Sequence, residues 1–256
     1  MTTNTPPTGM RAFTLIWVGQ VFSLLGSAMT GFALSIWAWD LTKEATALAL
    51  VGFFNFMPIV LFSPVAGALV DRWNRKLVMM MSDLAAGLST VVIFLLLNAD
   101  QLQIWHLYLA GLFSGTFQAF QFPAYSASIS LMLPKEQYAR ASGMMSLAES
   151  ASGIFAPSLA ATLLAWLGIR GVLLFDIISF VFAVSMLLIV HIPQPTQTEA
   201  GKQGRGNLLK ESVYGFKYIW ARPSLLGLQM MFFMANLFGT LAMVLVSPMI
   251  LGRTGS

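Results

Sequence analysis

The 256-residue sequence contains no cysteine and few charged residues. The absence of cysteine excludes disulfides, thiolate nucleophiles and cysteine metal sites. Charged residues make up only 9% of the chain, whereas a soluble domain carries about 25%, so too little charge is present to cover a water-facing surface. The sequence also lacks a glycine-rich phosphate loop, paired catalytic carboxylates and a nucleophile elbow. A soluble enzyme and ATP-driven transport are therefore not expected, and no cofactor or metal site is predicted.

Apolar residues, by contrast, make up 57% of the chain. They gather in segments that reach the roughly 20 residues needed to cross a bilayer. These segments cover residues 12–38, 46–70, 77–98, 104–132, 142–168, 171–191 and 224–251. They do not alternate as barrel strands would, and backbone inside a bilayer must satisfy its own hydrogen bonds. The predicted fold class is therefore an all-α membrane protein.

The positive charges are distributed unevenly between the two ends of these segments. If the N-terminus is cytoplasmic, only Lys43, Arg170 and Arg253 of the 14 Lys and Arg residues lie outside the cell. This is a positive-inside bias, which sets the orientation of multi-pass proteins. The sequence therefore predicts a multi-pass protein of the cell membrane with its N-terminus in the cytoplasm.

The apolar segments divide the chain into four parts. We predict a disordered cytoplasmic tail over residues 1–11, a six-helix transmembrane bundle over 12–191, a cytoplasmic linker over 192–222, and a seventh transmembrane helix within 223–256. The linker ends in an amphipathic stretch from Leu208 to Trp220. This stretch is either a surface helix whose basic residues meet anionic lipid, or a solvated loop.

The connection between the second and third segments carries a motif. The ten residues from Gly67 to Lys76 read GALVDRWNRK. This resembles the G-x-L-x-D-R-x-G-R-K signature of the major facilitator superfamily, in the loop where that family carries it. Asn74 replaces the family's second glycine, and asparagine is the next best residue for a left-handed turn. A simple positive-inside loop would need only the bases, and it does not explain the spacing of Gly67 and Asp71.

We interpret this loop as a short turn that packs closely at Gly67 and holds one acid among several bases. Such a charge cluster can latch to a neighbouring helix in one transporter state and release in the other. Asp83, near the cytoplasmic end of the third helix, is expected to pair with the basic residues. The predicted conformational-switch residues are Gly67, Asp71, Arg72, Arg75, Lys76 and Asp83.

Further matches favour one branch of this family. Residues 153–158, GIFAPS, resemble the glycine–proline motif of the family's exporters, although an ordinary kink at Pro157 explains them equally well. Asp83, Asp176 and the stretch Gly215–Ile219 fit the branch of macrolide-efflux and enterobactin-export proteins. The resemblance covers nearly the whole chain.

The resemblance extends only to the first half of the family's plan, in which two six-helix bundles are joined by a cytoplasmic loop. It implies a six-helix major-facilitator-type N-terminal bundle plus a seventh transmembrane helix, present as a partial chain. The implied function is a secondary transporter of the bacterial inner membrane that exports drugs or small amphiphilic molecules by alternating access, as an antiporter driven by protons.

The implied partners are a small-molecule substrate, the lipid bilayer, and a second half or a homodimer partner. No nucleic-acid partner is expected. The alternative is a non-transporting truncated membrane protein or an interaction scaffold. Because rocking requires two bundles, we expect the 256-residue chain by itself not to transport.

Ionisable residues inside a membrane helix are costly and mark functional sites by default. Glu149, in the fifth segment, is predicted to take and release a proton as access alternates. Its position less than half a helix from the cytoplasmic end leaves simple hydration as the alternative. Asp176, about one turn into the sixth segment from outside, is predicted to have a structural role, with Arg170 as a poor partner at i−6.

Uncharged polar residues follow a three–four spacing along the first and fourth segments. In the family these two helices line the central cavity, so the resemblance implies substrate contacts. Helix–helix hydrogen bonding is the alternative, and it accounts well for the serines. The predicted substrate-binding residues are Gln20, Ser23, Ser27, Asn55, Gln118, Gln121, Tyr125 and Asn236.

Overall fold

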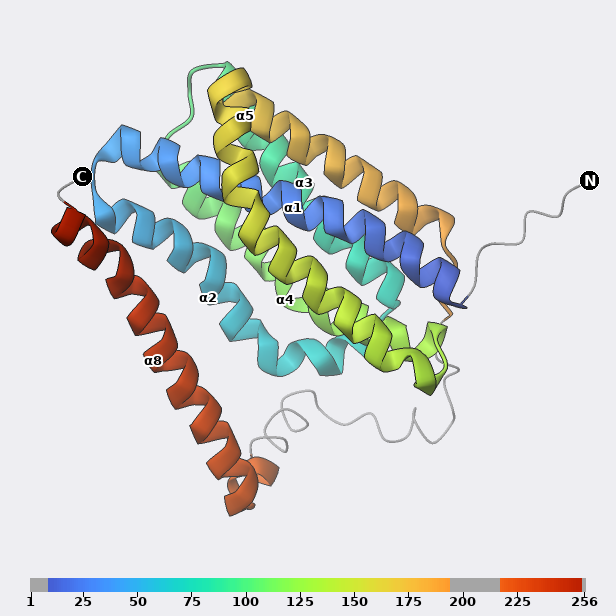
Figure 1. Ribbon diagram of the computed structural model, residues 1–256. Helices are drawn as coiled ribbons and strands as arrows, with labels where there is room; N and C mark the ends of the chain where they lie inside the picture. Colours follow the sequence, from blue (N-terminus) through green and yellow to red (C-terminus); the bar gives the residue numbers. More distant parts are fainter. Residues whose placement is uncertain (1–8, 194–216, 255–256) are drawn as a thin grey trace, which may run out of the picture. The chain divides into compact units, whose positions relative to one another are not determined.

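The computed structural model describes residues 9–193 and 217–254, and throughout these ranges the regular structure is helical (Figure 1). The chain divides into two compact units, Met1–Gln203 and Gly204–Ser256, which are described separately. The helices of the first unit are α1 (Gly9–Thr42), α2 (Ala45–Val70), α3 (Arg75–Asn98), α4 (Ile104–Met132), the short 3-10 helix η1 (Lys135–Gln137) and α5 (Tyr138–Ile189).

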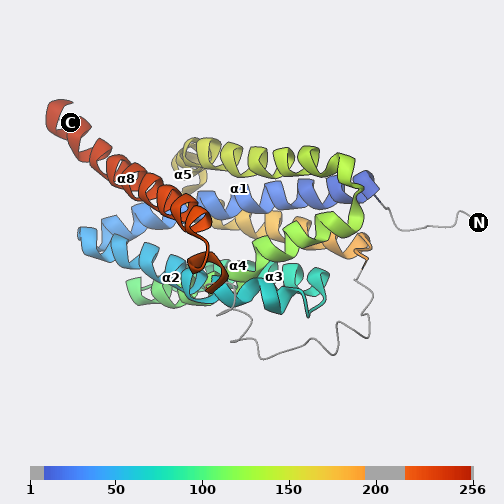
Figure 2. The ribbon, with the colours of Figure 1, turned by 90° about the horizontal axis from the view of Figure 1, so that it is seen from below.

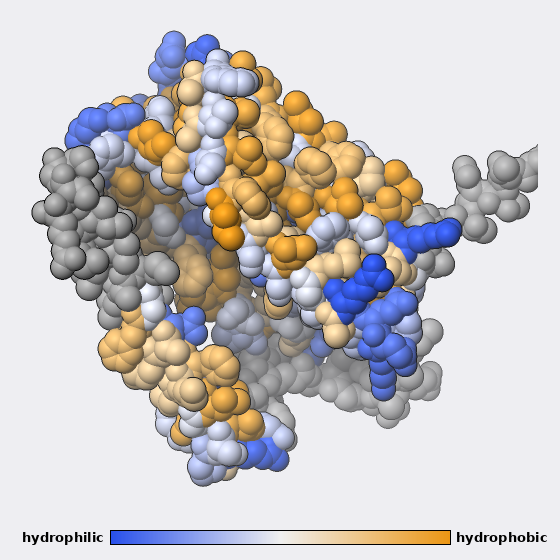
Figure 3. All heavy atoms as spheres, viewed as in Figure 1, coloured by the Kyte–Doolittle hydropathy of each residue, from blue (hydrophilic) through white to orange (hydrophobic). Residues whose placement is uncertain are grey.

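Four stretches of the described chain are long and apolar enough to cross a membrane: α1, α2, α3 and Lys135–Ile189. The helix α4 has 29 residues, a spanning length, but it is less apolar because glutamine, serine and threonine residues are spread along it. Apolar side chains cover the middle of the helices of the first unit in Figure 3, and hydrophilic ones gather near the helix ends. The predicted all-α membrane fold is confirmed.

The helix α5 consists of two helical arms rather than one continuous helix. Its 52 residues are interrupted at Gly168, which has φ 66° and ψ −176°. Only glycine adopts this backbone region readily, because a Cβ would clash with the neighbouring peptide groups. The chain changes direction there, and the two arms of α5 diverge in Figure 1. With its two arms counted separately, the described part of the first unit contains six long helical segments, and the predicted division between residues 168 and 171 lies at this break.

Two apolar clusters hold the ends of the bundle together. One joins the start of α1, the end of α2, the start of α3, the end of α4 and both ends of α5, through residues that include Phe13, Val70, Met79, Ile129 and Leu187. The other joins the opposite ends of α1, α3 and α4 to the second arm of α5, through Leu34, Ile93, Leu107 and Leu173. Between these clusters, the middle of the bundle carries the polar residues.

The ends of the chain depart from the predicted divisions. Residues 1–8 of the predicted tail lie outside the described residues, and Gly9 to Arg11 already belong to α1. Most of the linker and its amphipathic stretch also lie outside the described residues. In the second unit, the Arg222 guanidinium lies 3.5 Å from the centroid of the Tyr218 ring. The helix α8 (Pro223–Thr254) follows at the position predicted for the seventh helix.

Candidate functional site

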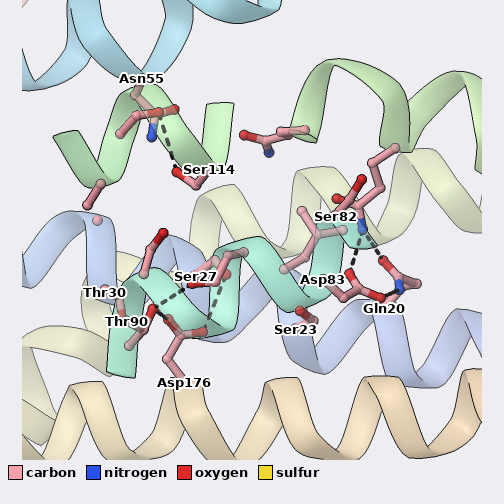
Figure 4. Close-up of a pocket in the computed structure, with 18 of the residues that line it drawn as sticks. Gln20, Ser23, Ser27, Thr30, Asn55, Ser82, Asp83, Thr90, Ser114 and Asp176 are labelled. Carbon is pink, nitrogen blue, oxygen red and sulfur yellow. Dashed lines mark hydrogen bonds between the residues drawn. The ribbon is translucent and has the colours of Figure 1, made fainter. Parts of the chain in front are cut away.

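A pocket of about 300 Å³ opens between the helices of the first unit. All five long helices of the unit contribute to its lining (Figure 4). The lining combines apolar side chains such as Trp17, Leu24 and Phe122 with polar ones. The sequence-predicted residues that line it are Gln20, Ser23, Ser27, Asn55, Asp83, Gln118, Gln121, Tyr125, Glu149 and Asp176.

Asn236 is the one predicted substrate-binding residue that belongs to the second unit. It lies in α8, and its side-chain amide donates to the backbone oxygen of Phe232 at 2.8 Å. This bond is local to one helical turn. The role of Asn236 as a substrate contact therefore stays a prediction.

Asp83 is the centre of the first polar cluster, which joins α3 to α1 and α4. The side chain of Asp83 is only 2% exposed. Its Oδ2 accepts a hydrogen bond from Gln20 Nε2 at 2.8 Å, and its Oδ1 accepts one from Gln121 Nε2 at 2.6 Å. Gln121 Nε2 also donates to Gln20 Oε1 at 3.0 Å. The three side chains thus form a closed network, and the two amides supply donors to both oxygens of a buried carboxyl group.

The expected pairing of Asp83 with the basic loop is therefore wrong. Asp83 lies about two helical turns beyond Lys76, and its carboxyl group faces the pocket rather than the end of the helix. The stripe of polar residues on α1 and α4 provides its partners instead. The placement of Asp83 in the basic switch loop is corrected to a place in the pocket wall.

Asp176 is the centre of a second polar cluster, which joins the second arm of α5 to α1 and α3. Its side chain is 3% exposed. Oδ1 accepts from Ser27 Oγ at 3.3 Å, and Oδ2 accepts from Thr90 Oγ1 at 2.8 Å. In the described part of the chain, its side-chain partners are hydroxyl groups of neighbouring helices rather than Arg170. Since Asp83 and Thr90 are seven residues apart on α3, the two clusters lie about 10 Å apart along the bundle, and Figure 4 shows them as separate groups.

Glu149 differs from both aspartates. It lines the same pocket but is exposed, and within the described part of the chain its carboxyl group has no hydrogen-bond or ion-pair partner. Gln118 and Asn55 are likewise exposed pocket residues. These three side chains are therefore free to contact a molecule that enters the pocket, whereas Gln20 and Gln121 are already engaged with Asp83.

The loop between α2 and α3 is tied to the bundle by its bases. Arg75 Nη2 forms an ion pair with Asp71 Oδ1 at 3.3 Å, and Arg75 Nη1 donates to the backbone oxygen of Ala127 in α4 at 3.1 Å. Lys76 Nζ donates to the backbone oxygens of Leu188 and Val190, at 3.0 and 2.7 Å. Carbonyls at the end of a helix attract cations, so Lys76 holds the start of α3 against the end of α5.

Two expectations about this loop are wrong. Asn74 does not adopt a left-handed turn: it has φ −68° and ψ 110° and caps α3, with its side-chain oxygen accepting from the Leu77 amide at 3.3 Å. Asparagine is among the best helix N-caps, which explains its presence equally well. Gly67 does not pack closely either, because a Cβ at that position would meet nothing within 4 Å.

Sequence reasoning missed the polar face of α3. Ser82, Ala86, Ser89 and Thr90 line the pocket beside Asp83. Small and polar residues at spacings of three and four along residues 82–90 were the available signal, because such residues share one helix face. Trp17 of α1 also lines the pocket, and it donates from Nε1 to the backbone oxygen of Met144 at 2.7 Å.

Comparison with known sequences agrees with this architecture. The family model for the Major Facilitator Superfamily matches residues 16–255. The chain is 30% identical to macrolide efflux protein A of Streptococcus pyogenes over 182 residues, which are 71% of this chain and 45% of that protein. It is 23% identical to the enterobactin exporter EntS of Shigella flexneri over 222 residues, 85% of this chain and 52% of that protein.

A third relative is the uncharacterized MFS-type transporter YkuC of Bacillus subtilis, which is 24% identical over 210 residues. These cover 81% of this chain and 48% of the relative. The chain therefore spans about half the length of the curated relatives it matches.

Proposed function

Because this chain belongs to the major facilitator superfamily, we propose that it forms part of a secondary transporter that exports drugs or other small amphiphilic molecules. The observation that carries this proposal is the pocket in the first unit. It places polar side chains from several helices around a cavity inside a bundle that is otherwise apolar. Transporter sites of this kind lie near the middle of the membrane.

The lining of the pocket suits an amphiphilic substrate. Trp17, Leu24 and Phe122 offer apolar surface, while the exposed amides of Asn55 and Gln118 offer hydrogen bonds. Ligand sites commonly combine a mostly apolar wall with a few polar groups that fix orientation. The names of two relatives, a macrolide efflux protein and an enterobactin exporter, support export as the direction of transport.

Export in this proposal is driven by proton exchange, with Glu149 as the proton-coupling residue. Glu149 is an acid in a spanning segment, lines the pocket and has no hydrogen-bond partner in the described part of the chain. A carboxyl group in this position is accessible to protons whenever the pocket is open to water. Alternating access then exposes it to one side of the membrane at a time.

Dye accumulation in an efflux-deficient bacterial host tests this function. Cells that express the complete open reading frame of this gene should accumulate less of a fluorescent amphiphile than cells with an empty vector. A protonophore should abolish the difference, because export then loses its driving force. Glu149→Gln should abolish it as well, because glutamine cannot exchange a proton, while the matched control Glu136→Gln, in η1 and outside the pocket, should not.

Each outcome of this experiment has a definite meaning. Equal accumulation in the two cell types, with the protein present in the membrane, would overturn export and favour the non-transporting scaffold. Export that persists in Glu149→Gln would remove the coupling role from this residue and leave the transport proposal standing.

The N-terminus lies in the cytoplasm in this proposal. Six bases of the described chain belong to one end of the bundle: the start of α1, the α2–α3 loop and the α4–α5 connection. They are Arg11, Arg72, Arg75, Lys76, Lys135 and Arg140. Lys43 and Arg170 belong to the opposite end. This distribution supports an inside position for the first end.

Cysteine labelling tests this orientation directly, because the chain has no cysteine of its own. Asn74→Cys, in the exposed α2–α3 loop, should not be labelled by a membrane-impermeant maleimide in intact cells, and it should be labelled once the cells are permeabilised. Gln101→Cys, in the α3–α4 loop at the opposite end, should react in intact cells. The reverse pattern would contradict a cytoplasmic N-terminus.

A further inference from the structure

The cluster around Asp176 consists of oxygen atoms from three separate helical segments. The carboxylate belongs to the second arm of α5, Ser27 Oγ to α1 and Thr90 Oγ1 to α3, and both hydroxyls lie within 3.3 Å of it. The hydroxyl of Thr30, one turn along α1, faces the same carboxylate. Thr30 is 6% exposed, and within the described part of the chain its Oγ1 makes no hydrogen bond of standard geometry, so its contact with the Asp176 carboxylate is a loose one. A buried hydroxyl without a well-formed hydrogen bond is rare and requires an explanation.

The backbone of α1 leaves room for this cluster. At Gly26, a Cβ would collide with Ser179 Oγ and would lie 2.8 Å from Asp176 Oδ1. The close approach of α1 to α5 therefore depends on the absence of a side chain at residue 26. It brings Ser27 and Thr30 to the carboxylate, and the cluster faces the pocket, since Ser27, Thr30, Thr90 and Asp176 all line it (Figure 4).

The donor chemistry separates this cluster from the one at Asp83. Around Asp83, two amide groups direct N–H donors at the carboxyl oxygens, and the Gln20 oxygen already accepts a bond from Gln121. A cation there would meet N–H groups. Around Asp176, within the described residues, the side-chain partners are hydroxyls. Each hydroxyl can rotate its hydrogen away and turn a lone pair to a cation.

We propose that Asp176, Thr90, Ser27 and Thr30 bind a sodium ion between α1, α3 and α5. Hard cations take carboxylate and neutral oxygen ligands, and in transporters coupling ions bind near the middle of the membrane. A single carboxylate neutralises one positive charge, whereas a divalent ion would leave net charge in a low-dielectric site. The two hydroxyl oxygens lie 2.8 and 3.3 Å from the carboxylate oxygens, so an ion between them must push these oxygens apart. Sodium, the smaller ion, requires less of this movement than potassium.

A sodium ion in this position would add a shared ligand to three helical segments that already meet through apolar packing and hydrogen bonds. The arms of α5 and the helices α1 and α3 would then be more stable together with the ion than without it, because a ligand that binds only the folded state stabilises it. This inference goes beyond the proposed export function, since it concerns ion binding by the bundle without any substrate.

Thermal unfolding of the purified 256-residue chain in detergent tests the proposal. The unfolding temperature should rise by roughly 5 °C in saturating sodium chloride, relative to equal concentrations of potassium or choline chloride. Asp176→Asn should lose this shift, since it removes the charge. Thr90→Val should weaken it, since it removes one oxygen ligand, while Thr90→Ser should restore it. Thr162→Val, an exposed threonine outside the pocket, is the matched control and should keep the full shift.

Direct binding of radioactive sodium, measured by equilibrium dialysis, gives a second readout if a variant unfolds too readily for the first. Sodium binding by the parent chain that disappears in Asp176→Asn would support the site. An unfolding temperature that is the same in sodium, potassium and choline salts, without sodium retention, would overturn it. A response to pH alone would also overturn it, because the carboxyl group would then bind only a proton. None of these results depends on export of a dye.

Discussion

Gln121→Leu is expected to lower the free energy of unfolding by about 1–3 kcal/mol. Leucine is close to glutamine in size, so the change removes hydrogen bonds with little change in packing. Gln121 donates to Asp83 at 2.6 Å and to Gln20 at 3.0 Å, so leucine leaves Oδ1 of a buried carboxyl group without its donor. An unsatisfied buried polar group costs its full desolvation penalty. Thermal unfolding in detergent measures the effect, at roughly 2–4 °C per kcal/mol.

Gln118→Leu is the matched control for this experiment. Gln118 lies one turn before Gln121 on α4 and lines the same pocket, but it is exposed and, in the described part of the chain, has no hydrogen-bond partner. Its replacement should change the stability by no more than about 0.5 kcal/mol, as for other exposed positions. Equal losses from the two substitutions would show that the Asp83 network does not stabilise the fold.

Replacement of the whole network separates its structural role from its role in transport. A variant with leucine at Gln20, Asp83 and Gln121 leaves no buried donor or acceptor of the network unpaired. Its stability should return to near that of the parent chain, because apolar replacement of a complete polar network is often neutral. Dye export by the complete reading frame should nonetheless be lost, because the pocket wall then lacks three of its polar side chains, including a carboxyl group. Retained export would show that this network does not contribute to the transport site.

The positions of the helices could be predicted well because each rests on a local pattern. The run from residue 104 to 132 is bounded by polar residues, and α4 spans Ile104–Met132. The break at Gly168 was also visible, since a glycine ends the fifth apolar run. Both features depend on neighbours in the sequence, and the apolar length alone decides that a segment spans the membrane.

The details of the site could not be predicted in the same way, because they depend on contacts distant in sequence. Asp83 was expected to pair with bases fewer than twelve residues away, but its partners lie 63 and 38 residues away. Sequence spacing shows that these side chains share a helix face, not which helices meet. The prediction of a left-handed turn at Asn74 was wrong for a different reason. Asparagine suits both a left-handed turn and a helix N-cap, and only the start of α3 at Arg75 decides between them.

The approach of α2 to α4 gives the most direct steric prediction. Asn55 of α2 lies over two glycines of α4 that are one turn apart. A Cβ at Gly111 would lie 3.2 Å from the Asn55 backbone nitrogen, and a Cβ at Gly115 would collide with the Asn55 backbone oxygen. A backbone atom cannot rotate away as a side chain can. Any residue larger than glycine at position 115 must therefore push the two helices apart.

Gly115→Ala is therefore expected to destabilise the protein by about 1–3 kcal/mol, the usual cost of overpacking, despite the better helix propensity of alanine. Gly153→Ala is the matched control, because Gly153 is also inside a helix and its Cβ would meet nothing within 4 Å. It should gain about 0.5–1 kcal/mol from the lower conformational entropy of the unfolded chain. Thermal unfolding of the two variants side by side measures the difference.

Because Asn55 also lines the pocket, Gly115→Ala should shift the pocket wall and reduce dye export, while Gly153→Ala should leave the wall in place. Equal stability of the two variants would mean that α2 does not lie on Gly115 as the structure describes.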